Sequence, residues 1–182
     1  MSHPTTPSYI KYLDNGWEKA REHPAMAWME KYTNFFDLRA FDTPHSDWHT
    51  NDFTLHKADG AVVKGGRQAW AALAEIYGPF AAHVHNPVFL ACWETADGWG
   101  MMGCADVCIN LPVSGEQPKV KDRYGKDWDV IIPGAFKFDY VKDASAKYDG
   151  LKLRRTEIFY DSGPAVKRML QRGMIKPEEL MQ

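Results

Sequence analysis

The chain has 182 residues, of which 45% are hydrophobic and 25% are charged, and its formal net charge is −2. These values are typical of one globular domain, and they argue against nucleic acid as a partner because the chain has no basic excess. The apolar runs are too short to span a membrane, and the first residues lack the apolar core of a secretory signal. The three cysteines cannot all pair with one another, which favours the reducing cytoplasm. We therefore predict a single domain over residues 1–182, with its core at about 9–173.

The first part of the chain is predicted to be mainly helical, with one strand. A short helical piece is expected at about residues 8–22, and Pro24 suits the first position of the longer helix that follows. In that longer helix the apolar residues recur at helical spacing, at Ala25, Trp28, Met29, Tyr32, Phe35 and Phe36. Residues 48–66 alternate and contain a turn, which indicates a strand with a short extension. Residues 66–80 are predicted to form a second amphipathic helix, whose apolar face carries Ala69, Trp70, Leu73, Ile76, Tyr77 and Phe80.

After Pro79 the pattern changes to that of strands. Residues 83–95 and 99–113 flank the hairpin turn Ala96-Asp97-Gly98, and further strands are expected over residues 126–144 and 151–161. Within the third of these, Pro133-Gly134 predicts a bulge or bend. Ser162 is the candidate cap of a C-terminal helix, which together with the tail spans 163–182. Helices followed by a run of strands predict an α+β fold, in which a curved antiparallel sheet carries the helices on one face and encloses a cone-shaped apolar pocket.

Two motifs suggest ligands that the surrounding sequence does not support. Gly98–Gly103 matches the pattern G-x-G-x-x-G, but strand-like residues follow it where a nucleotide site requires the N-terminus of a helix. His83, His85, Cys104 and Cys108 offer four zinc ligands. However, two cysteines four residues apart on a strand lie about 13 Å apart, which is too far to share one ion. We therefore expect neither a nucleotide nor a metal.

General acid–base chemistry remains, and it centres on two histidines. His83 and His85 share one face of the predicted strand, roughly 6–7 Å apart, because side chains alternate between faces. His85 is the candidate acid or base, since imidazole titrates near neutral pH and a nearby carboxylate would orient it. The alternative is that both rings are core polar groups with satisfied hydrogen bonds. The candidate carboxylates are Asp37, Asp52 and Asp129, with Asp106 as a further one.

Aromatic side chains are the candidates for holding a substrate. The chain contains seven Trp, and large aromatic residues line pockets as readily as they fill cores. Tyr32 and Tyr140 could donate hydrogen bonds to a substrate oxygen. The residues expected to contact a substrate on these grounds are Tyr32, Tyr140, Trp28, Trp93 and His83.

Four segments resemble the SnoaL-like proteins of the nuclear transport factor 2-like superfamily, especially those of fungal secondary metabolism. These segments are HNPVFLACWETADGW, GKDWDV, GAFKFDYVKD and RTEIFYDSGPAV. The resemblance spans about residues 9–173. It implies a cone-shaped α+β barrel with a deep apolar pocket, dimers or larger oligomers, and chemistry without a cofactor. Scytalone dehydratases and polyketide cyclases share this fold.

The resemblance to the scytalone dehydratase pattern is mixed at the level of single residues. Asp37 falls where those enzymes have an aspartate after the helix, and His85 (or His83) falls at their first catalytic histidine. Phe53 stands where a substrate-binding tyrosine is expected. The segment WGMMGCADV lacks the second catalytic histidine, and Ala135-Phe136 occupies the place of a polar Ser and Asn. The resemblance thus implies the fold with a different site.

The favoured interpretation is a cofactor-free enzyme that acts on an apolar polyketide or terpenoid intermediate by dehydration, isomerisation or cyclisation. His85 would be the acid or base, and Asp129, Asp37 or Asp52 would be its partner or a second acid. The expected partners are an apolar small molecule and further copies of the chain in a homodimer or larger oligomer, with no nucleic acid and no membrane. The alternative is a non-catalytic protein of the same fold that binds a hydrophobic ligand or serves as a dimeric adaptor.

Overall fold

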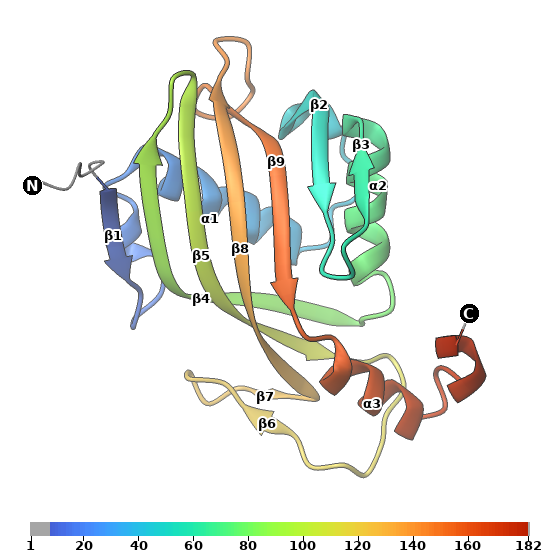
Figure 1. The fold of residues 1–182 in the computed structure, drawn as a ribbon. Coiled ribbons are helices and arrows are strands. Elements are labelled where there is room, and N and C mark those ends of the chain that lie inside the picture. The colour runs from blue at the N-terminus through green and yellow to red at the C-terminus, as the bar shows by residue number, and fades with distance from the viewer. Residues whose placement is uncertain (1–7, 182) are drawn as a thin grey trace, which may run out of the picture.

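The fold comes from a computed structural model, which describes residues 8–181 (Figure 1). In this part of the chain, seven strands form one sheet in the order β1-β4-β5-β8-β9-β2-β3, and β6 and β7 form a separate hairpin. The strands are β1 (Ser8–Tyr12), β2 (His49–His56), β3 (Val62–Lys64), β4 (Ala82–Glu94), β5 (Gly98–Asn110), β6 (Val120–Lys121), β7 (Asp127–Trp128), β8 (Val130–Lys142) and β9 (Leu151–Tyr160). The helices are α1 (Pro24–Asp37), α2 (Gly66–Tyr77) and α3 (Gly163–Gln171), with 3-10 turns at Glu18–Ala20, His45–Asp47 and Pro177–Met181. The predicted domain limits, residues 1 and 182, lie outside the described residues.

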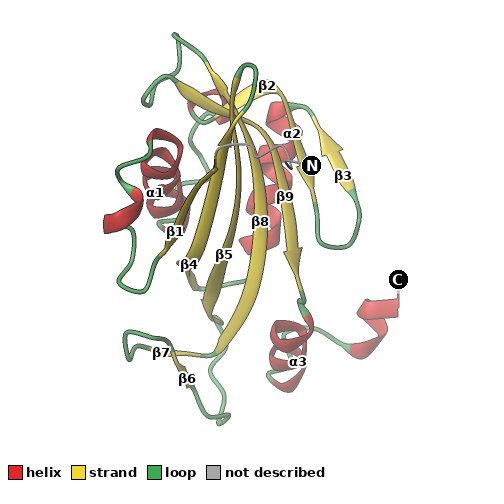
Figure 2. Ribbon diagram, turned by 60° about the vertical axis from the view of Figure 1, so that its left-hand side comes forward, coloured by secondary structure: helices red, strands yellow, loops and turns green. Residues whose placement is uncertain are grey.

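The sheet is curved, and α1 and α2 lie on its concave side, whereas α3 lies beyond the lower end of β9 (Figure 2). The α1 helix begins at Pro24, as its sequence predicts, and buries Trp28 and Phe36 on the face toward the sheet. All neighbouring strands of the large sheet pair antiparallel except β2 and β9, which are parallel. The predicted α+β architecture with a curved sheet is confirmed. Among residues 8–181 no helix is long and apolar enough to cross a membrane.

The helix predicted over residues 8–22 is wrong. Its first part is the strand β1, which pairs with β4 from Ser8↔Trp93 to Tyr12↔Phe89, and only a 3-10 turn follows at Glu18–Ala20. The segment SYIKY alternates in exposure, which is the pattern of an edge strand rather than of a helix. Gly16, with a φ of 83°, then turns the chain in a conformation that a continuous helix excludes.

Of the two alternatives predicted at Pro133-Gly134, a bulge or a bend, the pairing of β8 with β5 shows no bulge. Strand β8 pairs with β5 through this point without a shift in register. Pairing between β8 and β9 begins at Gly134, so the N–H that Pro133 lacks is not needed in that ladder. The register shift next to the cavity lies instead in β4, between Pro87 and Phe89.

The glycines of Gly98–Gly103 serve close packing, as expected for a hairpin rather than a nucleotide site. A Cβ atom at Gly98 would collide with the carbonyl oxygen of Tyr140, and one at Gly100 would collide with the indole of Trp93. The residues lie inside β5 after the predicted turn at 96–98, with no helix following them. The hairpin predicted at residues 96–98 is confirmed.

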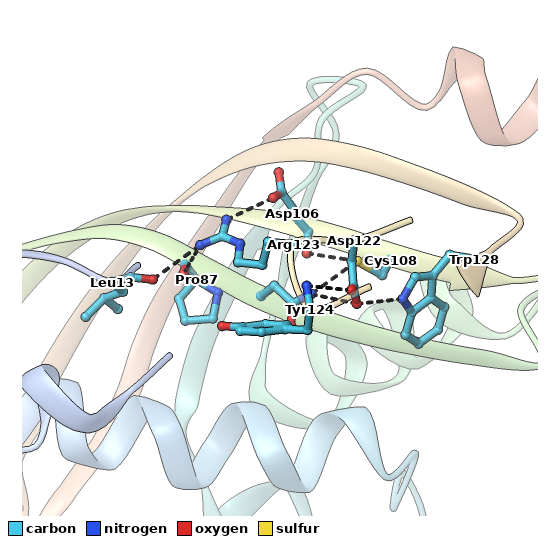
Figure 3. Close-up of polar contacts among 9 residues, drawn as sticks. Leu13, Pro87, Asp106, Cys108, Asp122, Arg123, Tyr124 and Trp128 are labelled. Atoms are coloured by element: carbon cyan, nitrogen blue, oxygen red, sulfur yellow. Dashed lines mark hydrogen bonds and ion pairs between the residues drawn. The ribbon is translucent and has the colours of Figure 1, made fainter. Parts of the chain in front are cut away.

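The β6–β7 hairpin is fastened to the outer face of the sheet by polar contacts (Figure 3). Arg123 donates to the carbonyl oxygens of Leu13 and Pro87 at 3.2 and 3.3 Å, and it pairs with Asp106 at 2.9 Å. Asp122 accepts two backbone N–H groups of its own turn at 2.9 Å. Because the β4 register shifts directly after Pro87, Arg123 satisfies a carbonyl group at the point where the ladder is irregular.

Candidate functional site

A histidine and an aspartate from distant elements meet on the concave side of the sheet. Nδ1 of His85, on β4, lies 2.7 Å from Oδ1 of Asp37, the last residue of α1. The backbone N–H of His85 donates to the other carboxylate oxygen, Oδ2, at 3.0 Å. Both oxygens of Asp37 therefore bind the same residue. With Asp37 ionised, Nδ1 carries the hydrogen, and Nε2 is the basic nitrogen of the ring.

Tyr77 completes this arrangement from the end of α2. Its hydroxyl oxygen lies 3.0 Å from Nε2 of His85. Burial raises the pKa of Tyr77 well above its ordinary value, so the phenol stays protonated and donates to Nε2. The sequence analysis placed Tyr77 on the apolar face of its helix and missed this role. The available signal was proximity, because only four residues separate the end of α2 from β4, which carries His85.

His85 and Tyr77 both line a cavity between the helices and the sheet. The cavity contains about 640 Å³ of space between atoms, including its open mouth. Its walls are apolar for the most part, with Phe36 from α1, Leu73 from α2 and Phe136 from β8. A mainly apolar cavity with a few convergent polar groups is the usual form of a small-molecule site. Among its lining residues, the ionisable side chains that face the cavity are those of Tyr32, Tyr77 and His85, whereas Cys104 is exposed on the opposite face of β5 from Ala105.

His83 lies beside this pair but inside the core. Its ring shares a face of β4 with His85, as predicted, and the ring centroids are 5.6 Å apart. The side chain of His83 has no exposed surface, and its Nε2 lies 3.6 Å from Oδ1 of Asp37. Burial, followed by the like charge of His85, lowers the pKa of His83 to about 4. His83 is therefore a neutral ring that packs behind the Asp37–His85 pair.

Comparisons with known proteins agree with this architecture. A scan against protein-family models and a search of curated proteins gave no match to the sequence. Solved structures do match. A candidate scytalone dehydratase from Novosphingobium aromaticivorans has a TM-score of 0.58 and 14% identity, over 79% of this chain and 85% of that chain. The LinA-type3 hexachlorocyclohexane dehydrochlorinase of Novosphingobium barchaimii has a TM-score of 0.55 and 14% identity, over 82% and 90%. A candidate SnoaL-like polyketide cyclase from Shewanella denitrificans has a TM-score of 0.51 and 13% identity, over 79% and 94%.

The chain has the SnoaL-like cone fold. At these identities the likeness concerns the fold alone, and the chemistry of this chain depends on its own residues. In this SnoaL-like cone, the aspartate and histidine that the resemblance singled out, Asp37 and His85, lie together at the cavity. Phe136, which stands in the region of a polar residue in the dehydratase pattern, is part of the apolar lining.

The structure does not bring the other predicted carboxylates to His85. Asp129 pairs with Arg172 of the C-terminal region, with two N–O distances of 2.9 and 2.8 Å, and also accepts the backbone N–H of Leu111. Asp52 is exposed on β2, because its neighbour Phe53 takes the inward position of the alternating strand. Neither residue is among those that line the cavity. Of the three carboxylates predicted as partners of His85, the structure brings Asp37 to it, and the alternatives Asp129 and Asp52 are corrected.

The aromatic residues predicted to contact substrate divide into two groups. Tyr32 lines the cavity, and its hydroxyl lies 3.1 Å from Nε2 of His49. The side chains of Trp28, Phe53 and Tyr140 are fully buried in the core, outside the cavity lining. Trp93 packs across Gly100 and does not reach the cavity either. Large aromatic residues recur in the core and in the pocket alike, so residue type alone does not separate the two.

The four residues that the sequence offers as zinc ligands, His83, His85, Cys104 and Cys108, do not form one cluster in the structure. Among residues 8–181, the group with metal-ligand geometry is Asp37, His83 and His85, whose ligand atoms lie within 4.8 Å of one another. We expect no metal there, because the 2.7 Å contact between Asp37 and His85 is a hydrogen bond that keeps a proton on the ligand nitrogen. Elemental analysis of the purified protein should show no stoichiometric transition metal. One bound zinc per chain, lost in His83→Ala, would contradict this expectation.

Buried histidines should make the stability of the protein depend on pH. The pKa of His83 is lowered by burial from 6.5 to about 4, so between these values the unfolded chain binds a proton that the folded chain does not. The free energy of unfolding should therefore fall as pH decreases from 6.5 toward 4, with a contribution from His83 on the order of 3 kcal/mol. Urea unfolding across this range should show a shallower loss for His83→Leu than for the wild type. Parallel curves for the two proteins would contradict the prediction.

Proposed function

We propose that the protein is a cofactor-independent enzyme in which His85 transfers a proton on a largely apolar small molecule bound in the cavity. The observation that carries this proposal is the 2.7 Å contact between Nδ1 of His85 and Asp37, with His85 at the cavity wall. Asp37 fixes the tautomer that leaves Nε2 basic, and its negative charge stabilises the imidazolium that forms when Nε2 takes a proton.

The chemical step follows from these positions. Nε2 removes a proton from a carbon of the substrate, and the electrons of that C–H bond either expel a leaving group or move into an adjacent unsaturated group. The first course is an elimination such as dehydration, and the second leads to isomerisation or cyclisation. Tyr77 and Tyr32 line the same cavity, and in this structure their hydroxyls contact Nε2 of His85 and Nε2 of His49. In the proposed step Tyr77 turns from Nε2 to a substrate oxygen, which frees Nε2 to take the proton and gives that oxygen a hydrogen-bond donor. The structural relatives named as a dehydratase and a dehydrochlorinase support elimination as the first reaction to test.

The apolar lining supports an apolar substrate, and we propose a polyketide or terpenoid intermediate. The sequence resemblance suggests that it belongs to fungal secondary metabolism, and the three free thiols fit a cytoplasmic enzyme. The other candidate function, binding of a hydrophobic ligand without catalysis, is favoured by the same lining. It is disfavoured by the Asp37–His85–Tyr77 arrangement, which a purely apolar ligand would not need.

A generic reporter of a base in an apolar cavity tests the proposal before the substrate is known. In the ring opening of 5-nitrobenzisoxazole, a base removes the C–H proton, the N–O bond breaks, and a coloured nitrile phenolate forms. The protein should accelerate this reaction above the rate given by free imidazole at the same concentration and pH. A protein that binds the reporter but gives no acceleration would support the binding function instead.

We also propose that the protein forms a homodimer or a larger assembly through the outer face of the sheet. Cross-strand partners place Tyr12, Phe89, Cys104, Ala135 and Phe159 in one continuous row over β1, β4, β5, β8 and β9. Tyr12 and Phe159 are 66% and 49% exposed, so this row is an uncovered apolar surface. Such a surface on a β-sheet is typical of an interface between subunits.

Light scattering at micromolar concentration should give the mass of a dimer or larger oligomer. Phe159→Glu should shift the mass toward that of the monomer, because it introduces a charge into the buried contact. Val62→Glu is the matched control, since Val62 is an exposed hydrophobic residue on β3, away from the row. A monomeric mass for the wild type would remove the proposal.

A further inference from the structure

A second apolar cavity lies under α3, next to the one that contains His85. It contains about 690 Å³ of space between atoms and is lined by the end of α2, the sheet and α3. Among its lining residues the only polar side chains are those of Tyr77, Tyr160 and Ser162, and none of these is a carboxylate or an amine. The mechanism proposed above makes no use of this space.

The two cavities follow one another along a single concave surface. The first contains Ala105 of β5 and Ile158 of β9, and the second contains the next residues on the same faces, Val107 and Tyr160. Strand β8 contributes Phe136 to the first cavity and Ile132 to the second. On each of these three neighbouring strands, residues on one face therefore line the first cavity and then the second.

Two residues define the boundary between the cavities. Tyr77 is the residue that lines both of them, and its hydroxyl contacts His85. On the opposite side, β8 has Gly134 between Phe136 and Ile132, and Gly134 contributes no side chain. A Cβ atom there would lie 3.2 Å from the ring of Phe136 and 3.5 Å from Cβ of Tyr160, within the boundary itself.

We propose that the cavity under α3 is a subsite for an apolar extension of the substrate, whose reactive end lies at His85. The substrate class is then an elongated molecule with one polar, proton-losing end and a hydrocarbon chain or apolar ring system beyond it. This inference rests on the proposed function for the position of the reactive end. The lining supports it, because residues such as Val166 and Met169 offer only apolar contact.

Unbranched methyl ketones test the subsite, since they combine one hydrogen-bond acceptor with a chain of adjustable length. For the wild type, the Kd measured by calorimetry from heptan-2-one to tridecan-2-one should fall by about fourfold for each added CH₂, as the chain leaves water. Val166→Phe places a ring in the second cavity. It should leave the Kd of heptan-2-one within about twofold of the wild-type value and raise the Kd of tridecan-2-one at least tenfold. Val166→Leu is a milder substitution for the case that Val166→Phe perturbs folding. It should also raise the Kd of the long ketones, but by less.

Leu170→Phe is the matched control, because Leu170 lies on α3 outside the lining of both cavities. It should leave the whole series unchanged. The inference fails if no ketone binds, if Val166→Phe leaves the long ketones unaffected, or if it weakens short and long ketones equally, which would indicate a separate site. His85→Gln separates this inference from the proposed function. It should keep the chain-length series and lose the base-catalysed ring opening. A wild-type protein that shows the chain-length series but no base-catalysed activity would uphold the subsite and refute the enzyme.

Discussion

Replacing His85 with alanine should lower the rate of 5-nitrobenzisoxazole ring opening by about 10²–10⁴-fold, the usual contribution of a positioned acid or base. The fold should survive, because His85 sits at the cavity wall and its removal leaves Asp37 facing space that water can enter. Asp37→Asn should also slow the reaction, since the asparagine amide can donate to Nδ1 and so stabilise the tautomer in which Nε2 carries the hydrogen.

His83→Ala is the comparison that separates catalysis from packing. Its effect on the rate should be smaller than that of His85→Ala, because His83 lies outside the cavity lining. If both rings serve only the core, each variant should instead lose about 1–3 kcal/mol of stability and keep its activity per folded molecule. Thermal melting and rate measurements on the same preparations distinguish the two cases. An unchanged rate per folded molecule in His85→Ala would end the assignment of His85 as the base.

Replacing Arg172 with methionine should destabilise the protein by about 3–5 kcal/mol, the cost of leaving a buried charge without its partner. The side chains of Arg172 and Asp129 are only 2% and 6% exposed, and two N–O contacts join them. The guanidinium also donates to the carbonyl oxygen of Val113 at 2.7 Å, so the pair ties the C-terminal region to the loop after β5. Denaturant unfolding measures the loss.

Two further variants complete this experiment. Arg172→Met combined with Asp129→Leu should recover much of the stability, because neither charge is then left alone. Arg168→Met, in the last turn of α3, should cost less, since Arg168 makes one contact at 3.5 Å to a backbone carbonyl. The hydrogen bond to Arg172 lowers the pKa of Asp129, so the stabilisation should be present above about pH 4 and lost as pH falls further. A loss below 1 kcal/mol in Arg172→Met would contradict the prediction.

The sequence singled out His83 and His85 but could not identify the carboxylate that lies beside them. Strand alternation alone places His83 and His85 on one face, and their rings do lie together. The choice among the three carboxylates depended on how α1 crosses the sheet, which no local pattern specifies. Asp129 was misjudged because its partner, Arg172, is 43 residues further along the chain.

The other errors have a common cause, since local signals were given more weight than tertiary contact. SYIKY was read as helix because the strand that pairs with it, β4, comes some 70 residues later in the chain. Tyr77 was assigned to the core because helical spacing shows which face is apolar, but not which hydroxyl on that face meets a histidine. The α+β class, the 96–98 hairpin and the start of α1 at Pro24 were predictable because their signals are local.

The parallel pairing of β2 with β9 has a consequence for synthesis on the ribosome. His49 lies opposite Leu153, so β2 has no sheet partner on that side until most of the chain has been translated. Within residues 8–181, the other strand that pairs with β2 is the short β3, which is at the edge of the sheet. Contacts this far apart in sequence form late and slowly. Nascent chains that end before β9 should therefore expose the apolar face of β2 and depend on chaperones. The sheet would be complete only after β9 has been translated and has paired with β2.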